Sequence, residues 1–331
     1  MRLMPQEIQS CVMYLKMTNL YLIETDCTNP YHNIALEEYL LDTLPVNSVI
    51  LYLWQNYRTV VIGRNQSANQ EVNYKQLEEN GGFLARRLSG GGAVFHDLGN
   101  LNFTFIMANK DFDLDKQTDV ILKAINSLGI NAIKNGRNDL TVDGHKFSGH
   151  AYYHGKENSY HHGTIMLDVN NDELVKYLNV SKKKLASKSI KSVRSRVINL
   201  KQLKPKLTIV EVKEALIESF EEVYGNKVVR INDDVEIEDR IKKFSDPNWI
   251  YDKDENYEFS KEQRFDWGIV NIKYDVEKMV IKDIAIYTDC LDSGALQQLP
   301  GKLKQKPLDN KLYSLTNNEY EKDVIGLLLG G

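Results

Sequence analysis

Strand-like segments follow one another closely in the first third of the chain, and their order constrains the fold more than any other feature. They cover Val49–Trp54, Thr59–Gly63, Gly92–His96 and Asn102–Met107, after a first strand at Asn19–Glu24. Gly, Asn or Asp stands at most of the bends between them. Because these strands do not alternate with helices, a doubly wound parallel sheet is disfavoured. We predict an α+β fold whose mixed, mainly antiparallel sheet has flanking helices.

Three helices and two hairpins can be placed by their start, stop and turn signals. The helices are expected from the Asn29-Pro30 cap to about Leu41, over Asp115–Leu128 before Gly129, and from the capping box Thr208-x-x-Glu211 to near Gly225. The hairpins are expected to join Asp139–Val142 to His145–Ser148 through the type I′ signal Asp143-Gly144, and Ala151–His154 to Tyr160–Asp168 across Gly155-Lys156.

The patterning lapses around Asp246-Pro247-Asn248, and a new unit begins near Phe265 with two alternating strands and short helices. A chain of 331 residues is long enough for two domains. We expect an N-terminal extension without an assigned role (1–18), a large domain (19–246), a linker (247–261) and a small α+β C-terminal domain (262–331).

Composition excludes several classes of protein. The 42 Lys and Arg against 46 Asp and Glu give a net charge of −4, so no global basic field favours nucleic acid. No stretch approaches 18 consecutive apolar residues, so no membrane span is predicted. The three cysteines are widely spaced and form no CxxC pair, as expected of reduced thiols in a cytoplasmic protein. Without a coiled-coil pattern, a monomer is expected.

The densest signal is the block from Arg86 to Asn100, RRLSGGGAVFHDLGN. A glycine triplet before a strand lets backbone N–H groups approach an anion, and adjacent arginines are bidentate phosphate donors. A flexible hairpin turn is the alternative. The block matches neither a Walker A loop nor G-x-G-x-x-G.

Asp139 and Lys146 flank the Asp143-Gly144 turn on neighbouring strands, which places a carboxylate near an ammonium group. The pair is either a surface ion pair or a site for Mg²⁺ on Asp139 and an anionic oxygen on Lys146. A second basic feature is the run from Lys182 to Lys206, which holds ten basic residues and no acid. It is either a solvated surface or a binding segment for an anionic ligand or an acidic partner. The acidic run Asp233–Asp239 is read as solvated surface.

The segment Arg86–Phe105, RRLSGGGAVFHDLGNLNFTF, resembles the signature of the lipoate–protein ligase A family. Further segments that fit this family occur in the expected order, and the resemblance spans about residues 19–331. These segments are Asn33–Tyr39, Leu53–Asn56, Val61–Gln66, Gly136–Leu140, Lys146–Gly149, His161–Thr164 and Arg194–Leu200.

The resemblance implies a biotin/lipoate ligase fold with a class II synthetase-like core. It implies an enzyme for which ATP and Mg²⁺ are cofactors and lipoate is a substrate. Lipoate would first form lipoyl-AMP with release of pyrophosphate, and the lipoyl group would then pass to a lysine of an apo lipoyl domain. The implied partners are the H protein of glycine cleavage and the acyltransferase subunits of 2-oxoacid dehydrogenases.

The resemblance also assigns roles to individual residues. Lys146 is the expected catalytic residue, because its ammonium group would bridge the lipoate carboxylate and the α-phosphate. The expected ATP contacts are Arg87, Gly92, Ala93, Val94, Phe95, Lys146 and Asp139, with Asp139 also the candidate Mg²⁺ ligand. The expected lipoate contacts are Ser89, Gly90, Gly91, Lys146, His162 and Gly163. The basic stretch Lys182–Arg196 would form an adenylate-binding loop.

Five side chains also receive structural readings. His96 is expected to hydrogen-bond within the sheet, and Trp54 and Phe147 to be core or tunnel-wall aromatics. His161 and His162 should point to opposite faces of one strand, which argues against a shared metal.

Three alternatives remain beside the ligase. A lipoyl or octanoyl amidotransferase of the same fold would use a cysteine nucleophile, but no cysteine lies between residues 28 and 289. A non-catalytic lipoyl-binding pseudoenzyme would tolerate loss of Lys146, which is present. A biotin ligase would carry a GRGRxxR-type loop, which is absent.

Overall fold

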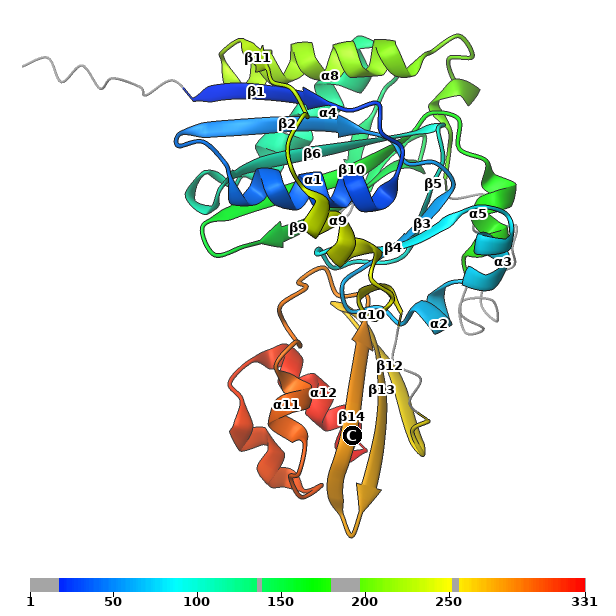
Figure 1. Cartoon of the computed structure of the whole chain (residues 1–331), viewed down its shortest axis with the longest axis vertical. Helices are drawn as coiled ribbons and strands as arrows, with labels where there is room; N and C mark the ends of the chain where they lie inside the picture. Colours follow the sequence, from blue (N-terminus) through cyan, green and yellow to red (C-terminus); the bar gives the residue numbers. More distant parts are fainter. Residues whose placement is uncertain (1–17, 136–138, 180–196, 252–255, 331) are drawn as a thin grey trace, which may run out of the picture.

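The computed structural model describes residues 18–135, 139–179, 197–251 and 256–330, and its strands form three sheets (Figure 1). The largest is eight-stranded, in the order β11 (Val228–Arg230), β1 (Asn19–Glu24), β2 (Ser48–Trp54), β6 (Asn100–Ala108), β10 (Asn158–Met166), β9 (His145–His154), β8 (Asp139–Val142), β7 (Ile133–Asn135). The other two are three-stranded: β4 (Phe83–Arg86), β3 (Thr59–Ile62), β5 (Val94–His96), and β12 (Phe259–Phe265), β13 (Gly268–Glu277), β14 (Val280–Thr288).

The large sheet is mixed and mainly antiparallel, as predicted. Strand β1 pairs in parallel with β2 and β11, whereas every pairing from β2 across to β7 is antiparallel. In the β4–β3–β5 sheet, called the small sheet below, β3 pairs in parallel with β4 and antiparallel with β5.

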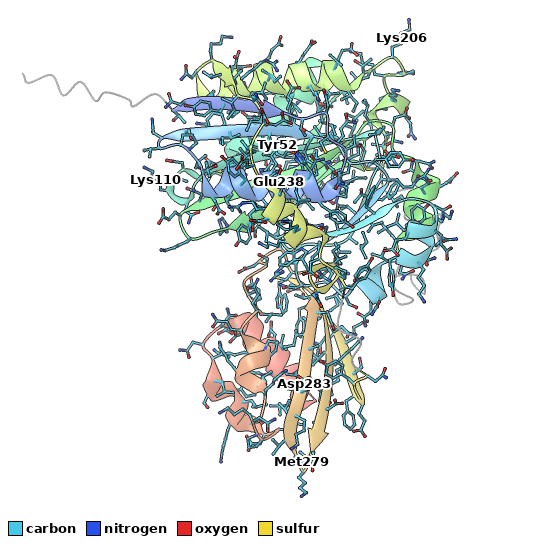
Figure 2. All side chains as sticks on the ribbon, viewed as in Figure 1. Tyr52, Lys110, Lys206, Glu238, Met279 and Asp283 are labelled. Carbon is cyan, nitrogen blue, oxygen red and sulfur yellow. The ribbon has the colours of Figure 1, made fainter. Side chains whose placement is uncertain are left out.

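Helices cover both faces of the large sheet. Helices α4 and α8 pack on one face around a core that contains Phe103 and Phe105, and α1 and α9 pack on the other around Tyr52 and Tyr160 (Figures 1 and 2). The helices are α1 (Pro30–Asp42), α2 (Ala68–Glu71), α3 (Tyr74–Glu79), α4 (Leu114–Ser127), α5 (Asn171–Tyr177), α8 (Ile209–Tyr224), α9 (Glu238–Ser245), α10 (Pro247–Ile250), α11 (Leu299–Leu303) and α12 (Glu319–Leu329), with 3-10 turns at Asn109–Asp111, Leu200–Gln202 and Asn310–Leu315.

The predicted helix signals act as expected. The Asn29 side chain accepts the N–H of Tyr31 at the start of α1. Thr208 and Glu211 form the reciprocal capping box of α8, which ends at Gly225 with a φ of 72°.

The turn between β8 and β9 has the predicted type I′ character, with φ values of 49° at Asp143 and 77° at Gly144. Strand β9 then continues without a break to His154, so the two hairpins predicted around it share one ten-residue strand. A register shift opposite Leu140 and Thr141 lets the strand turn the Lys146 side chain over Gly149.

Residues 256–330 fold around a core of their own. One face of the β12–β14 sheet packs against α11 and α12, with Ile272, Ile284 and Leu303 in that core (Figure 1). Met279 lies at the tip of the β13–β14 hairpin, far from Tyr52 in the large sheet (Figure 2). The predicted linker 247–261 includes α10 and the start of β12.

No helix in the part of the chain that the structure describes is long and apolar enough to cross a membrane.

Candidate active site

A cavity of about 160 Å³ lies between the large sheet, α1 and the glycine-rich loop. Its residues come from six strands, α1 and that loop. They are Ile34, Glu37, Trp54, Val61, Arg87, Gly91, Gly92, Ala93, Val94, His96, Asn102, Lys146, Gly149, His150, Ala151, His162, Gly163 and Thr164. The predicted residues Lys146, Arg87, Gly91 to Val94, His162 and Gly163 are therefore brought together around one cavity.

Strand register aligns one wall of the cavity in a row that crosses the sheet. Asn102 on β6 is opposite Trp54 on β2 and opposite Thr164 on β10. Thr164 accepts the Gly149 N–H from β9 at 3.3 Å, and Gly149 is opposite Asp139 on β8. From β9 to β2 this row spans three interstrand spacings, or roughly 14 Å. The cavity thus has a Lys146 end and a Trp54 end.

Lys146 and Asp139 form an ion pair at the β8–β9 end of this row, with 2.6 Å between Nζ and Oδ1. Their side chains are 35% and 39% exposed, so both are open to solvent and to a ligand. Lys146 lies directly over Gly149, where a Cβ atom would stand 2.8 Å from its Nζ. The absence of a side chain at Gly149 therefore provides the space that the Lys146 ammonium group occupies.

Arg87 lies at the end of β4 with its guanidinium group buried under the glycine loop. It donates to the carbonyl oxygens of Val61, Gly90 and Gly92 and to Ser89 Oγ, over 2.7–3.3 Å. Burial lowers the pKa of Arg87 to about 10, so the group stays charged at neutral pH. Its hydrogen bonds fix the conformation of the loop.

Arg86 does not face the cavity, although both arginines were predicted to face an anion. Neighbouring residues of a strand point to opposite sides, and Arg86 donates to carbonyl oxygens of Gln66, Trp249 and Ile250. Arg86 thus holds α10 against the small sheet and does not line the cavity.

Ser89 and His162 belong to a buried hydrogen-bond chain behind the cavity wall. Ser89 Oγ lies 2.8 Å from His162 Nε2, and His162 Nδ1 lies 2.8 Å from Glu37 Oε1. Glu37 Oε1 also accepts from Thr104, which in turn accepts from the Trp54 indole. Ser89 is fully buried and is not a lining residue, so the chain orients His162 and Glu37 and presents no hydroxyl to the cavity.

Two of the three loop glycines meet the C-terminal part of the chain. Gly91 donates its N–H to the Cys290 carbonyl oxygen at 2.9 Å. A Cβ atom at Gly90 would stand 2.1 Å from that same oxygen, whereas nothing lies within 4 Å of one at Gly92. Gly90 therefore makes room for Cys290 and does not line the cavity, although the resemblance made it an expected lipoate contact. Phe95 also points away, into the core beside Tyr177.

His161 and His162 point to opposite faces of β10, as predicted. His161 is buried between Phe103 and Phe105, and its Nε2 lies 3.0 Å from His150 Nδ1. Burial lowers the pKa of His150 to about 3 and holds the pKa of His161 well below its usual value. Both imidazoles are neutral at neutral pH. Among the described residues no three His, Cys, Asp or Glu side chains are grouped as a metal site.

Comparison with known proteins assigns this architecture to a family. The family model for the lipoyl protein ligase A/B catalytic domain matches residues 29–221, and the model for the bacterial lipoate protein ligase C-terminus matches residues 254–325. A relative named lipoate-protein ligase A, from Blochmanniella pennsylvanica (strain BPEN), is 41% identical over 307 residues, covering 89% of this chain and 91% of the relative. This chain belongs to the lipoate–protein ligase A family.

Solved structures of lipoate ligases share the fold. LipL1 of P. falciparum in complex with lipoate has a TM-score of 0.82 at 29% identity and covers 95% of this chain and 100% of its own. A bi-partite lipoate protein ligase from Thermoplasma acidophilum, solved with its E2 lipoyl domain, has a TM-score of 0.64 at 28% identity, covering 70% and 96%. A lipoate-protein ligase A bound with ATP has a TM-score of 0.60 at 25% identity, covering 71% and 97%.

Several lining residues of this lipoate ligase family member had no assigned role in the sequence. Glu37, Asn102, His150 and Thr164 each line the cavity, and Trp54, read as core or tunnel wall, lines it as well. The only sequence signal for Glu37 and Trp54 is their place inside the segments Asn33–Tyr39 and Leu53–Asn56 that fit the family. The predicted adenylate-binding stretch Lys182–Arg196 and the segment Gly136–Asn138 lie outside the described residues.

Proposed function

We propose that this chain is an ATP-dependent lipoate–protein ligase, which activates lipoate as lipoyl-AMP and transfers the lipoyl group to a lysine of a lipoyl domain. The observation that carries the proposal is one cavity that runs across the sheet from Lys146, which is paired with Asp139, to Trp54. An ammonium group at one end and the Trp54 ring at the other suit a carboxylic acid with a medium-length chain. Family membership supports the same reaction.

In the first step the lipoate carboxylate attacks the α-phosphorus of ATP, and both reactants are anions. Lys146 would hold the attacking carboxylate oxygen and an α-phosphate oxygen on one ammonium group, where negative charge builds up. In the second step the same group would polarise the acyl carbonyl as the acceptor lysine amine attacks; the amide bond forms, the bond to the phosphate breaks and AMP leaves. Its separation of 2.6 Å from Asp139 supports this role, because the pair holds the Lys146 side chain over Gly149.

The glycine-rich loop would supply the nucleotide contacts. Backbone N–H groups from Gly92 to Phe95 can approach phosphate oxygens, and nothing lies within 4 Å of a Cβ position at Gly92. Arg87 would support nucleotide binding indirectly, because its N–H groups donate to carbonyl groups of the loop and fix the loop conformation. Gly91, His162 and Gly163, which line the cavity, would form the wall beside the acyl chain, and Ser89 and Gly90 would support that wall from behind.

Mg²⁺ fits this site only together with the nucleotide. Magnesium in nucleotide sites commonly takes one or two carboxylates plus phosphate oxygens, and Asp139 is a carboxylate at the Lys146 end of the cavity. When bound, the ion would neutralise charge on the phosphates. Asp139 would then share its oxygens between Mg²⁺ and Lys146.

We extend the proposal to the domains, the partners and the cellular location of the enzyme. We propose residues 19–246 as the catalytic domain and 262–331 as an accessory domain, supported by the separate core of the latter. Acceptors would be apo lipoyl domains, including H protein and acyltransferase subunits, and the enzyme would act in the cytoplasm as a monomer.

The test is the intact mass of purified apo H protein after incubation with this chain, lipoate and Mg²⁺, with and without ATP. An ATP-dependent gain of one lipoyl group is expected. Transfer from lipoyl-H protein without ATP would instead indicate an amidotransferase. A chain that binds lipoate but neither releases pyrophosphate nor modifies any lipoyl domain would be a non-catalytic binding protein.

A further inference from the structure

Two buried nitrogen donors line the cavity without a partner in the described part of the chain. They are His96 Nε2 on β5 and Asn102 Nδ2 on β6. His96 is 4% exposed and Asn102 is 1% exposed. A buried polar group that forms no hydrogen bond destabilises the fold, so two such groups beside one cavity suggest that a ligand completes them.

The proton on His96 can be placed from its neighbours. Asn33 Nδ2 faces the carbonyl oxygens of Cys27 and Gln55 at 2.9 Å, which can only accept, so this atom is a donor. It also lies 3.0 Å from Asn56, whose facing atom is therefore Oδ1. The other amide atom of Asn56, Nδ2, then donates to His96 Nδ1 at 3.2 Å.

His96 Nδ1 is therefore an acceptor, and the neutral ring carries its proton on Nε2. Burial, with the Arg87 guanidinium nearby, lowers the pKa of His96 to about 3. The ring thus stays neutral, and Nε2 is a fixed N–H donor. Asn102 is similar, because its Oδ1 accepts from Asn100 at 2.9 Å and leaves Nδ2 as the donor.

Both donors lie at the Trp54 end of the cavity. The His96 ring meets the Trp54 ring edge to face, with 6.2 Å between centroids, and Asn102 is the register partner of Trp54. Lys146 is at the opposite end of the row. An acid whose carboxylate meets Lys146 therefore places its far end beside His96 and Asn102.

We propose that His96 Nε2 and Asn102 Nδ2 select an acyl chain that carries hydrogen-bond acceptors at its far end, as the two ring sulfurs of lipoate do. This inference rests on the proposed lipoate ligase function. Sulfur is a weak acceptor, and the methyl end of octanoate is none. Octanoate leaves both donors buried and unpaired, and a site built to hydrogen-bond its ligand rejects an analogue that lacks the group.

The test compares kcat/KM for ATP-dependent pyrophosphate release with lipoate and with octanoate. The wild-type chain is expected to prefer lipoate, and His96→Phe, which keeps a flat ring against Trp54 but has no donor, to reduce the preference about fivefold. Asn102→Leu is expected to act in the same direction. His96→Gln keeps a side-chain N–H donor and is expected to retain more of the preference than His96→Phe. His154→Phe, at an exposed histidine outside the cavity, is the matched control.

The outcomes separate the two hypotheses. If the wild-type chain releases pyrophosphate with neither acid, the proposed ligase function fails. If it uses lipoate but shows no preference over octanoate, or if His96→Phe and Asn102→Leu leave the preference unchanged, only the selection by His96 and Asn102 is overturned. If a variant does not fold, the test uses the wild-type chain alone. Lipoate is expected to raise its melting temperature more than equimolar octanoate does.

Discussion

The N–H of Gly91 donates to the carbonyl oxygen of Cys290 at 2.9 Å, which joins the glycine-rich loop to the segment that follows β14. A second backbone bond, from Thr288 to the carbonyl of Asn65, lies beside it. The loop is therefore held from two sides, by the Arg87 guanidinium within the catalytic region and by Cys290 from the C-terminal part. Any movement of the C-terminal part changes a hydrogen bond of the loop that borders the cavity.

We expect Gly90→Ala to break the hydrogen bond between Gly91 and Cys290, because the added Cβ would stand 2.1 Å from the Cys290 carbonyl oxygen. Hydrogen–deuterium exchange should show at least a tenfold loss of protection at the Gly91 amide and in residues 288–294. Gly92→Ala is the matched control, since nothing lies within 4 Å of its Cβ position. Equal protection in the two variants would contradict the prediction.

Lys146→Ala should lower pyrophosphate formation about 10²- to 10³-fold, since it removes the cation proposed to act where charge develops. Its ion pair with Asp139 is partly exposed, so the free energy of unfolding should fall by less than about 1 kcal/mol. Lys134→Ala serves as control, because it removes a cation of strand β7 that is paired with Asp115 on α4. Pyrophosphate release above a tenth of the wild-type rate in Lys146→Ala would rule out the assigned role.

Replacing Arg87 with leucine should destabilise the fold by about 3 kcal/mol or more, measured by urea unfolding. The change leaves the carbonyl groups of Val61, Gly90 and Gly92 without their donor, and each buried unpaired group costs about 1–3 kcal/mol. Arg230→Leu removes an arginine that is 62% exposed and should change stability by less than about 1 kcal/mol. Similar losses in both variants would show that the loop does not depend on Arg87.

Stability should fall as the pH is lowered from about 6.5. Burial depresses the folded-state pKa of His150 to about 3, below the value near 6.5 expected in the unfolded chain. The unfolded chain binds the proton first, so the stabilisation is complete above pH 6.5 and is lost progressively toward pH 3, by about 2 kcal/mol at pH 5. His150→Gln should reduce the difference in unfolding free energy between pH 7.5 and pH 5 by about that amount. His154→Gln, at an exposed site, should leave it unchanged.

Local signals in the sequence predicted the Lys146–Asp139 pair and the cap of α1 correctly. The pair depends on an eight-residue hairpin whose Asp143-Gly144 turn fixes the register, and the cap depends on Asn29 and its immediate neighbours. In both cases the interacting groups are close in sequence. Physical rules for turns and caps therefore suffice to place them.

Other parts of the fold gave no such signal. No helix was predicted over α9, although Ile237, Ile241 and Phe244 repeat at helical spacing and pack toward α1. Strand β12 is an edge strand with a mostly polar sequence, so its alternation is weak. The partnership of Trp54 with Asn102 depends on the register between β2 and β6, which no local pattern specifies.

The row of residues across the large sheet has a consequence for how activity appears during folding. Trp54, Asn102, Gly149 and Thr164 come from four strands spread over more than 100 positions of the chain, so their alignment requires contacts of high sequence separation. Closing such long loops is slow, and a slip of one residue in any strand would turn its side chain away from the cavity. Ligand binding should therefore recover only in the last kinetic phase of refolding, after the helices have formed.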